Sequence, residues 1–429
     1  MIKAVPVMSI LLFALQTAAP GEAQSTSRTP LFRGLFGPTD TDQTRPRRLD
    51  ATWSLYSAED DNSFLATDTD ILDAALQSRR WYSGATISLA YMRRPPRTVF
   101  KLNVSAATRY YPDLHRVVTT RQSGGVSVDH YLASDWRLHV SGDAGFTPFY
   151  QVLLSPSAPG LSSPDIVTPA ADYAVSKQHA MLYGSFVGLT HTYSDRADLA
   201  FNYGLRYTQL SGSPDVSTQR GGGQFTYLLN RGIGLRLGYA YGVATTGSTA
   251  SAIRNNDIDV GLNYGRTFSP SARTSFSFGS GSSIISSGDG RHFRVTGSGR
   301  LRRRLSPRWT TDLTYDRGLQ VPEGATRPFF SDSMTGSLNG YFSKRISLHA
   351  QPTYSHGVVG FQGKTNAYNS WASTTRIDVA LSRQVALYAE HFYYRYQFAN
   401  GVDLPSLLIM GTTRQGARAG LTVWTPLVR

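Results

Sequence analysis

The stretch Gly232-Ile-Gly-Leu-Arg-Leu-Gly-Tyr-Ala-Tyr-Gly-Val243 alternates between two kinds of residue. From Ile233 to Val243 every second position is aliphatic or aromatic, and the positions between them carry glycine, alanine or one arginine. A period of two predicts a β-strand. A soluble sandwich would place ordinary polar side chains opposite its apolar face. Tiny residues fit better on the crowded inner wall of a barrel whose outer face meets lipid.

The residues before this strand complete a hairpin. Phe225–Leu229 leads into Asn230-Arg231-Gly232, a turn too short for anything but an antiparallel connection. The same unit repeats from Leu49 onward, with strand lengths close to the roughly 9–11 tilted residues that cross a bilayer. We predict about 18 strands, at residues 49–57, 81–92, 99–111, 124–132, 136–146, 177–193, 198–208, 219–229, 233–243, 257–267, 272–280, 292–304, 309–317, 333–343, 347–355, 371–381, 385–397 and 415–428.

In this layout the connections alternate between short and long without exception. The short ones are Arg93–Thr98, Ala133–Asp135, Ser194–Ala197, Asn230–Gly232, Phe268–Ser271, Leu305–Arg308, Lys344–Ile346 and Ser382–Gln384. The long ones are Ala58–Arg80, Pro112–Ser123, Thr147–Ser176, Gln209–Thr218, Ala244–Asn256, Gly281–Arg291, Gly318–Asp332, His356–Ser370 and Phe398–Arg414. Short periplasmic turns and long extracellular loops are typical of bacterial outer-membrane barrels.

The bulk composition of the 429 residues agrees with a barrel. Mean hydropathy is −0.26, and no apolar run beyond the N-terminus has the roughly 18 residues that a membrane helix needs. A barrel escapes that scan because only every second residue is apolar. The chain has no cysteine, which excludes a disulfide scaffold and a thiol-based metal site. We expect no cofactor and no bound metal.

The N-terminus predicts export from the cytoplasm. Lys3 precedes the apolar run Val5–Leu15, and Gly21-Glu22-Ala23 offers small residues for cleavage before Gln24. We therefore expect a signal peptide at residues 1–23, a periplasmic lead-in at 24–48 and a single barrel domain at 49–429. The alternatives are a buried N-terminal helix for the first segment, and a lead-in tucked into the lumen for the second.

The signal, the hairpin ladder and the loop asymmetry resemble a Gram-negative outer-membrane β-barrel of the porin and exporter type. The resemblance covers essentially the whole mature chain. It implies an all-β antiparallel barrel in the cell outer membrane, placed there by the barrel-assembly machinery and contacting outer-membrane lipid and lipopolysaccharide. The chain departs from the type at its end, because its last aromatic residue is Trp424, followed by Pro426. The soluble competitor is a β-propeller or solenoid, which would not predict alternating loop lengths.

Strand parity assigns side chains to the lumen. We take the apolar parity as lipid-facing, because Arg or Lys there costs about 2–4 kcal/mol at the bilayer midplane. Phe293, Val295 and Leu301 then face lipid, and Arg303 points outward beside a turn. The predicted pore-lining residues are Arg206, Arg236, Asp257, Asp259, Arg294, Arg300, Arg302, Arg304, Asp312, Asp316, Arg376, Asp378 and Arg418.

The arginines of residues 294–304 have two interpretations. A basic, low-dielectric channel concentrates anions, so Arg294, Arg300, Arg302 and Arg304 would steer an anionic solute or an acidic polysaccharide. Alternatively, they pair across strands with Asp312 and Asp316, which is ordinary in a polar lumen. The proline-rich loop Thr147–Ser176 would either fold into the barrel as a gate or pack over its mouth.

The sequence therefore predicts an outer-membrane channel that passes hydrophilic solutes, with small anions or an exported polysaccharide as the candidate cargo. The alternative function is a structural or adhesin-like barrel whose lumen is plugged by the N-terminal segment or the loops. We predict no enzyme, since no G-x-S-x-G or H-E-x-x-H motif is present. Nucleic-acid binding is not expected either, because basic residues and aromatics do not cluster in one segment.

Overall fold

The computed structural model describes residues 34–38, 45–64, 80–112, 117–147, 179–211, 214–230, 233–247, 252–264, 274–287, 290–320, 329–360, 366–399 and 411–428. The predicted signal peptide and residues 148–176 of the predicted gating loop lie outside these ranges. Among the described residues, no helix is both long and apolar enough to cross a membrane.

The described residues form 18 strands in one sheet. Their bounds are β1 Arg47–Phe64, β2 Arg80–Arg93, β3 Thr98–Tyr111, β4 Val117–Tyr131, β5 Trp136–Thr147, β6 Ala180–Ser194, β7 Ala197–Leu210, β8 Val216–Leu228, β9 Ile233–Thr246, β10 Ile253–Tyr264, β11 Thr274–Ser287, β12 Gly290–Ser306, β13 Trp309–Gln320, β14 Phe329–Tyr341, β15 Ile346–Val359, β16 Ala367–Ala380, β17 Val385–Phe398 and β18 Gly411–Val428. Each predicted strand has a counterpart, so the all-β prediction and its strand number are confirmed.

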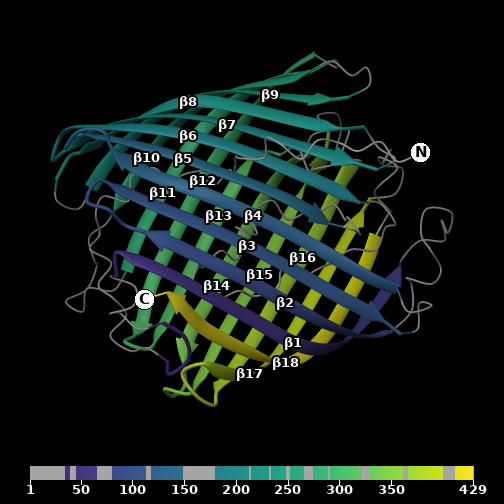
Figure 1. Cartoon of the computed structure of the whole chain (residues 1–429). Helices are drawn as coiled ribbons and strands as arrows, with labels where there is room; N and C mark the ends of the chain where they lie inside the picture. The colour runs from purple at the N-terminus through teal and green to yellow at the C-terminus, as the bar shows by residue number, and fades with distance from the viewer. Residues whose placement is uncertain are drawn as a thin grey trace, which may run out of the picture.

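The sheet closes on itself (Figure 1). Every strand pairs antiparallel with its chain neighbours, and β1 pairs with β18 from Leu49↔Val428 to Phe64↔Thr412. Because the first and last strands pair with each other, the sheet has no open edge strand. Pro426 lies opposite Asp50 and cannot donate a ladder hydrogen bond. The register between β1 and β18 shifts at this point, between Leu49 and Asp50. The predicted closed antiparallel barrel is therefore confirmed.

The two rims of the barrel differ, although not as regularly as predicted. We call the end that carries residues 94–97, 132–135, 342–345 and 381–384 the turn end, and the opposite end, where residues 65–79 and 148–179 connect strands, the loop end. Strict alternation is wrong at two places. Residues 265–273 connect β10 to β11 at the turn end, and only residues 288–289 connect β11 to β12 at the loop end.

The second exception arises because β11 and β12 run further than expected. The segment Gly281–Ser287 is rich in serine, which favours a loop in sequence, yet it continues the ladder with β12 up to Ser287↔Gly290. Its two isoleucines still alternate, with Ile284 exposed at 44% and Ile285 fully buried. Gly290 has φ +117, a backbone conformation that suits glycine after so tight a turn.

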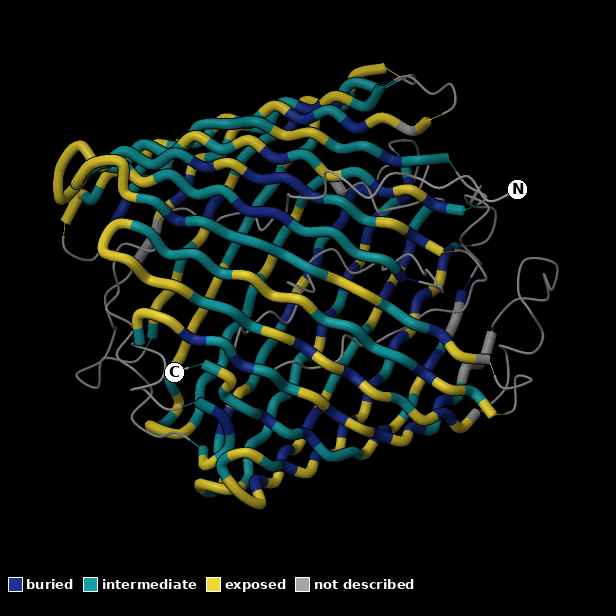
Figure 2. The backbone as a smooth tube through the Cα atoms, viewed as in Figure 1, coloured by how far each residue is buried: buried dark blue, intermediate teal, exposed yellow. Residues whose placement is uncertain are grey.

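The outer face carries an apolar band bounded by charge. On β12 the outward row is Arg291, Phe293, Val295, Gly297, Gly299, Leu301 and Arg303, with the apolar members exposed at 62%, 53% and 37%. About 12 residues at about 3.3 Å each, tilted by about 40°, span roughly 30 Å along the barrel axis, close to a bilayer. Figure 2 shows exposed and buried residues alternating along the strands.

Candidate functional site

The inner wall is the candidate site, and it divides into two arcs. We call the inward faces of β7–β13 the open arc, and those of β16, β17, β18, β1 and β2 the packed arc. Inward parity follows from the register, because Arg236, Gly261, Gly279 and Ser298 stand opposite one another on four successive strands. Their neighbours in sequence, such as Leu237 and Val260, are exposed on the outer face.

Ion pairs cross the open arc between adjacent strands. Arg236 Nε lies 2.6 Å from Asp259 Oδ2, and Arg220 Nη2 lies 2.7 Å from Asp257 Oδ2. The Arg220 side chain remains 52% exposed, although its carboxylate partner is mostly covered. Partly exposed pairs of this kind hold the wall polar but contribute little to stability.

Arg236 reaches its partners across a surface of glycines. Its Nη2 lies 3.4 Å from Ser298 Oγ, three strands away. A Cβ on Gly261 would approach the guanidinium within 3.0 Å, and one on Gly279 would overlap it. The small residues that identified the inner face in sequence are therefore what lets one arginine lie flat along the wall.

The predicted arginine row on β12 is partly paired. Arg300 donates to both oxygens of Asp312, from Nε to Oδ1 at 3.2 Å and from Nη2 to Oδ2 at 3.0 Å. Arg302 is exposed and has no ion-pair partner among the described residues. The Arg294 guanidinium lies 5.8 Å from the centre of the Phe330 ring. The interpretation of this row as cross-strand pairs thus holds for Arg300.

The other predicted wall residues of the open arc differ in exposure. Arg206 on β7 is exposed, and Arg304, the last inward arginine of β12, is half-buried. Asp316 lies opposite Ser298 and Ser333 in the ladder and makes no ion pair within the described ranges. Whether these side chains line a passage stays a prediction.

The packed arc contains a buried ion network at Arg376, Asp378 and Arg418, the remaining predicted residues. Arg376 Nη2 lies 2.7 Å from Asp378 Oδ1, and its Nη1 lies 3.8 Å from Glu390 Oε2. Glu390 also pairs with Arg418. All four residues are at most 9% exposed. These arginines therefore have little surface to offer a solute, and their pairing places them in the wall itself.

Aromatic rings surround this network. The Arg376 guanidinium stacks 3.9 Å from the centre of the Tyr388 ring, and Arg418 lies 5.7 Å from that of Tyr56. Tyr56 meets Tyr82 edge to face with 6.2 Å between ring centres. Stacked, desolvated guanidinium groups of this kind add about 2 kcal/mol each.

Sequence reasoning missed Arg414 and Asp60, because residues 58–80 were assigned to a loop. The structure extends β1 to Phe64, so that Asp60 accepts from Arg414 Nε at 2.8 Å and 2.9 Å. The pair is buried, with Arg414 5% and Asp60 6% exposed. The sequence did contain an indication of this pair, because Asp60 is a polar residue at an inward-facing position if the alternation of β1 is continued beyond Ser57.

Sequence reasoning also missed Glu390, because β17 reverses the parity rule. Its buried, inward row is Tyr388, Glu390, Phe392, Tyr394, Tyr396 and Phe398, whereas Ala389, His391 and Arg395 point outward. The more aromatic face of this strand therefore faces the inside of the barrel. The sequence did contain an indication of this reversal. Most aromatic residues of Val385–Phe398 share one parity, and the other parity includes His391 and Arg395, which are unfavourable on a lipid-facing surface.

Residues 34–38 of the predicted lead-in contact the turn end. Leu35 N donates to Lys344 O at 2.6 Å, and Gly37 N donates to Arg383 O at 3.0 Å. Arg383 in turn lies 5.5 Å from the Trp424 ring centre. Two short turns and the end of β18 are thus tied to one segment near the N-terminus.

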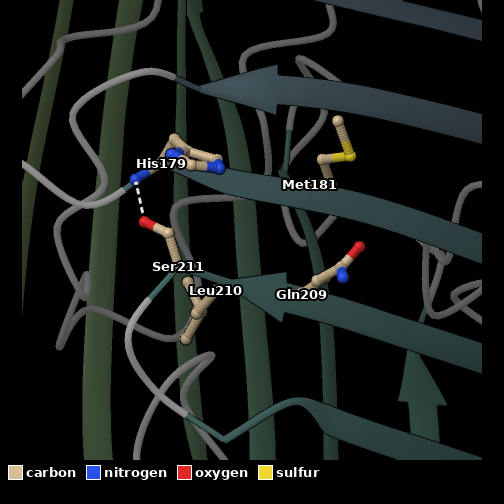
Figure 3. Close-up of a pocket in the computed structure, with 5 residues that line it drawn as sticks. All are labelled: His179, Met181, Gln209, Leu210 and Ser211. Atoms are coloured by element: carbon tan, nitrogen blue, oxygen red, sulfur yellow. Dashed lines mark hydrogen bonds between the residues drawn. The ribbon is translucent and has the colours of Figure 1, made fainter. Parts of the chain in front are cut away.

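One small pocket lies at the loop end of β6 and β7, lined by His179, Met181, Gln209, Leu210 and Ser211. His179 N donates to Ser211 Oγ at 2.9 Å, while Met181 and Gln209 stand apart from them (Figure 3). The described part of the chain contains no cluster of three metal-ligating side chains. The inner wall is therefore the better candidate site.

Comparisons with known proteins add likeness at the level of architecture. No family model and no curated protein matches the chain. The architecture is a closed antiparallel barrel of 18 strands. Similar solved structures include OccK7 (OpdD) of Pseudomonas aeruginosa, at 11% identity and TM-score 0.44 over 89% of this chain and 99% of that one. OpdQ of the same organism is 8% identical, with a TM-score of 0.45 over 91% of this chain and 100% of that one. OccAB3 of Acinetobacter baumannii is 11% identical, with a TM-score of 0.44 over 89% of this chain and 99% of that one.

Proposed function

We propose that this chain is an outer-membrane channel for hydrophilic solutes, and not an enzyme. The observation that carries the proposal is the asymmetry of the inner wall. A closed ring of 18 strands encloses more space than its own side chains fill, unlike a barrel of about eight. On the open arc, charged side chains such as Arg220 and Arg302 are exposed on the inner face. A water-filled path along the open arc would hydrate these charged side chains, which are neither buried in the wall nor on the lipid-facing surface.

The outer-membrane location rests on the outer face. Its apolar band ends in arginine at both rims of β12, which matches two headgroup layers about one bilayer apart. We place the turn end in the periplasm and the loop end outside, following the longer loop-end connections at residues 65–79 and 148–179.

The finer proposal concerns the cargo. Arginines and aspartates are both present on the open arc, but its predicted wall residues include six arginines and four aspartates, so the net charge favours an anion. Small anions and an acidic polysaccharide exported through the same path fit this charge equally. Electrostatic guidance would act through Arg206, Arg236, Arg294, Arg300, Arg302 and Arg304.

Planar-bilayer conductance of the purified full chain tests the proposal. We expect an ohmic current with anion preference. Adding an acidic oligosaccharide to one side should reduce the current if polysaccharide is the cargo, and a neutral oligosaccharide of equal length is the matched control. A block by neither oligosaccharide leaves small anions as the cargo.

The competing function is a non-conducting structural or adhesin-like barrel, and the packed arc favours it. Side chains as large as Tyr394 and Arg418 are at most 3% exposed on the inside, so at least part of the lumen is filled. Absence of current at any voltage, from protein that is folded in detergent, would establish this alternative and reject the channel.

A further inference from the structure

We propose that Arg254 and Arg291, on the outer face at the loop end, form a binding site for a phosphorylated lipid headgroup of the outer leaflet. The inference rests on the proposed outer-membrane placement, with the loop end outward, and does not depend on whether the barrel conducts.

The register places the two arginines together. Arg254 on β10 and Arg291 on β12 both stand opposite Ser286 of the intervening strand β11. Two strand spacings separate their Cα atoms by about 10 Å. Both side chains are exposed and share the outward parity of Ile258 and Phe293, so they project from the lipid-facing surface.

Both arginines are exposed beside the two-residue connection between β11 and β12. Gly290 directly precedes Arg291, and only residues 288–289 separate the two strands. The sequence of residues 281–291 predicts a long loop, in which the direction of the Arg291 side chain would be undefined. The ladder instead fixes its position beside Ser286.

Neither arginine is neutralised within the described residues. No ion pair or side-chain hydrogen bond joins Arg254 or Arg291 to them, whereas two other outward arginines at this end are satisfied. Arg317 Nη1 lies 3.3 Å from Asp332 Oδ1, and Arg395 donates to Gln397 at 3.4 Å. Two adjacent uncompensated guanidinium groups repel each other, and a bound anion removes that cost.

The surroundings indicate an amphiphile and not a free ion. Immediately below the arginines, toward the turn end, the outer face presents Ile258, Ile284 and Phe293, exposed at 50%, 44% and 62%. Acyl chains pack on this surface when the headgroup is held above it. Guanidinium groups bind phosphate oxygens with paired hydrogen bonds, and we assign phosphate as the charged group of the headgroup, which the dephosphorylated lipid tests.

The test measures binding of bisphosphorylated lipid A to the full chain in detergent micelles, by native mass spectrometry. The double substitution Arg254→Gln and Arg291→Gln should weaken binding about 10-fold to 30-fold, at about 1 kcal/mol for each arginine. Arg303→Gln, an outward arginine at the other end of β12, is the matched control and should retain the affinity of the unmodified protein.

Three outcomes overturn the site: equal binding by the double variant, an equal loss in Arg303→Gln, or equal binding of dephosphorylated lipid A. Inorganic pyrophosphate distinguishes the source of the phosphate. If the double substitution weakens binding of pyrophosphate, and lipid A does not bind, the assignment to a lipid headgroup is wrong. Conductance of the double variant should equal that of the unmodified protein, so failure of this site and failure of the channel are separate results.

Discussion

The packed arc and the open arc lie in the same ring of strands and use the same residue types, yet they place arginine in opposite situations. On the packed arc, Arg376 and Arg418 are 2% and 3% exposed and share Glu390 between aromatic rings. On the open arc, Arg220 and Arg300 are 52% and 44% exposed while holding one aspartate each. The difference teaches that inward parity alone does not make a pore-lining residue. The size of the neighbouring side chains decides whether an inward charge is buried in the wall or remains exposed.

The largest expected effect is on the packed arc. Glu390→Gln removes the carboxylate shared by Arg376 and Arg418 and leaves buried positive charge uncompensated. We expect a loss of about 3–5 kcal/mol in the free energy of unfolding, measured by urea titration in detergent micelles. The double change Glu390→Leu with Arg418→Met removes both charges and should recover most of the loss. A loss below about 1 kcal/mol for the single variant would show that the network is solvated.

A smaller effect is expected from filling the glycine surface of the open arc. Gly279→Val would drive a side chain into the position of the Arg236 guanidinium and displace it from Asp259. We expect a loss of about 1–3 kcal/mol in the same urea titration. Gly318→Val is the control, because a Cβ at that inward position meets nothing within 4 Å. Equal losses for the two variants would mean that the position of Arg236 does not matter to stability.

Breaking an open-arc ion pair should matter less still. Asp312→Asn leaves Arg300 without its carboxylate, but that side chain is 44% exposed and water replaces the partner. The expected loss is less than about 1 kcal/mol. The same variant should increase anion preference in bilayer recordings, because it frees positive charge on the inner face. A loss as large as that of Glu390→Gln would erase the distinction between the arcs.

The smallest effect on stability, and the most informative on function, is expected from Arg302→Glu with Arg304→Glu. Because Arg302 has no ion-pair partner among the described residues and Arg304 is only half-buried, the double change should leave the unfolding midpoint nearly unchanged. The reversal potential in a salt gradient should shift toward cation preference. Arg303→Glu, on the same strand but the opposite face, is the control and should not shift it. Unaltered reversal potentials for the double variant reject the guiding role of this row.

Much of the fold was predictable because a period of two is a local property. The alternation of Ile233–Val243 predicted both the strand and the direction of its side chains, and the outer exposure of Leu237 and Tyr239 agrees with it. The tight turns could also be predicted where charged and small residues interrupt the alternation of apolar and polar residues. The turn between β11 and β12 was not, because serine and glycine serve in loops and in small-residue strands alike.

The candidate site was predictable only in part. Cross-strand pairing between Arg300 and Asp312 was one of two interpretations left open, and the ladder between β12 and β13 brings them within reach. The network around Glu390 was not predicted, since its partners lie on β16 and β18 and depend on the register of both neighbours. The aromatic inner face of β17 also contradicts a rule that holds elsewhere in the barrel.

By itself, the sequence determined the strands, their alternation and the number of hairpins, because each depends on residues that are close in the chain. Only the tertiary structure decided which inward charges are buried and which are exposed, because burial depends on side chains from strands that meet through register and closure. Asp60 and Arg414 illustrate this: they lie near opposite ends of the chain and become partners only when β1 pairs with β18.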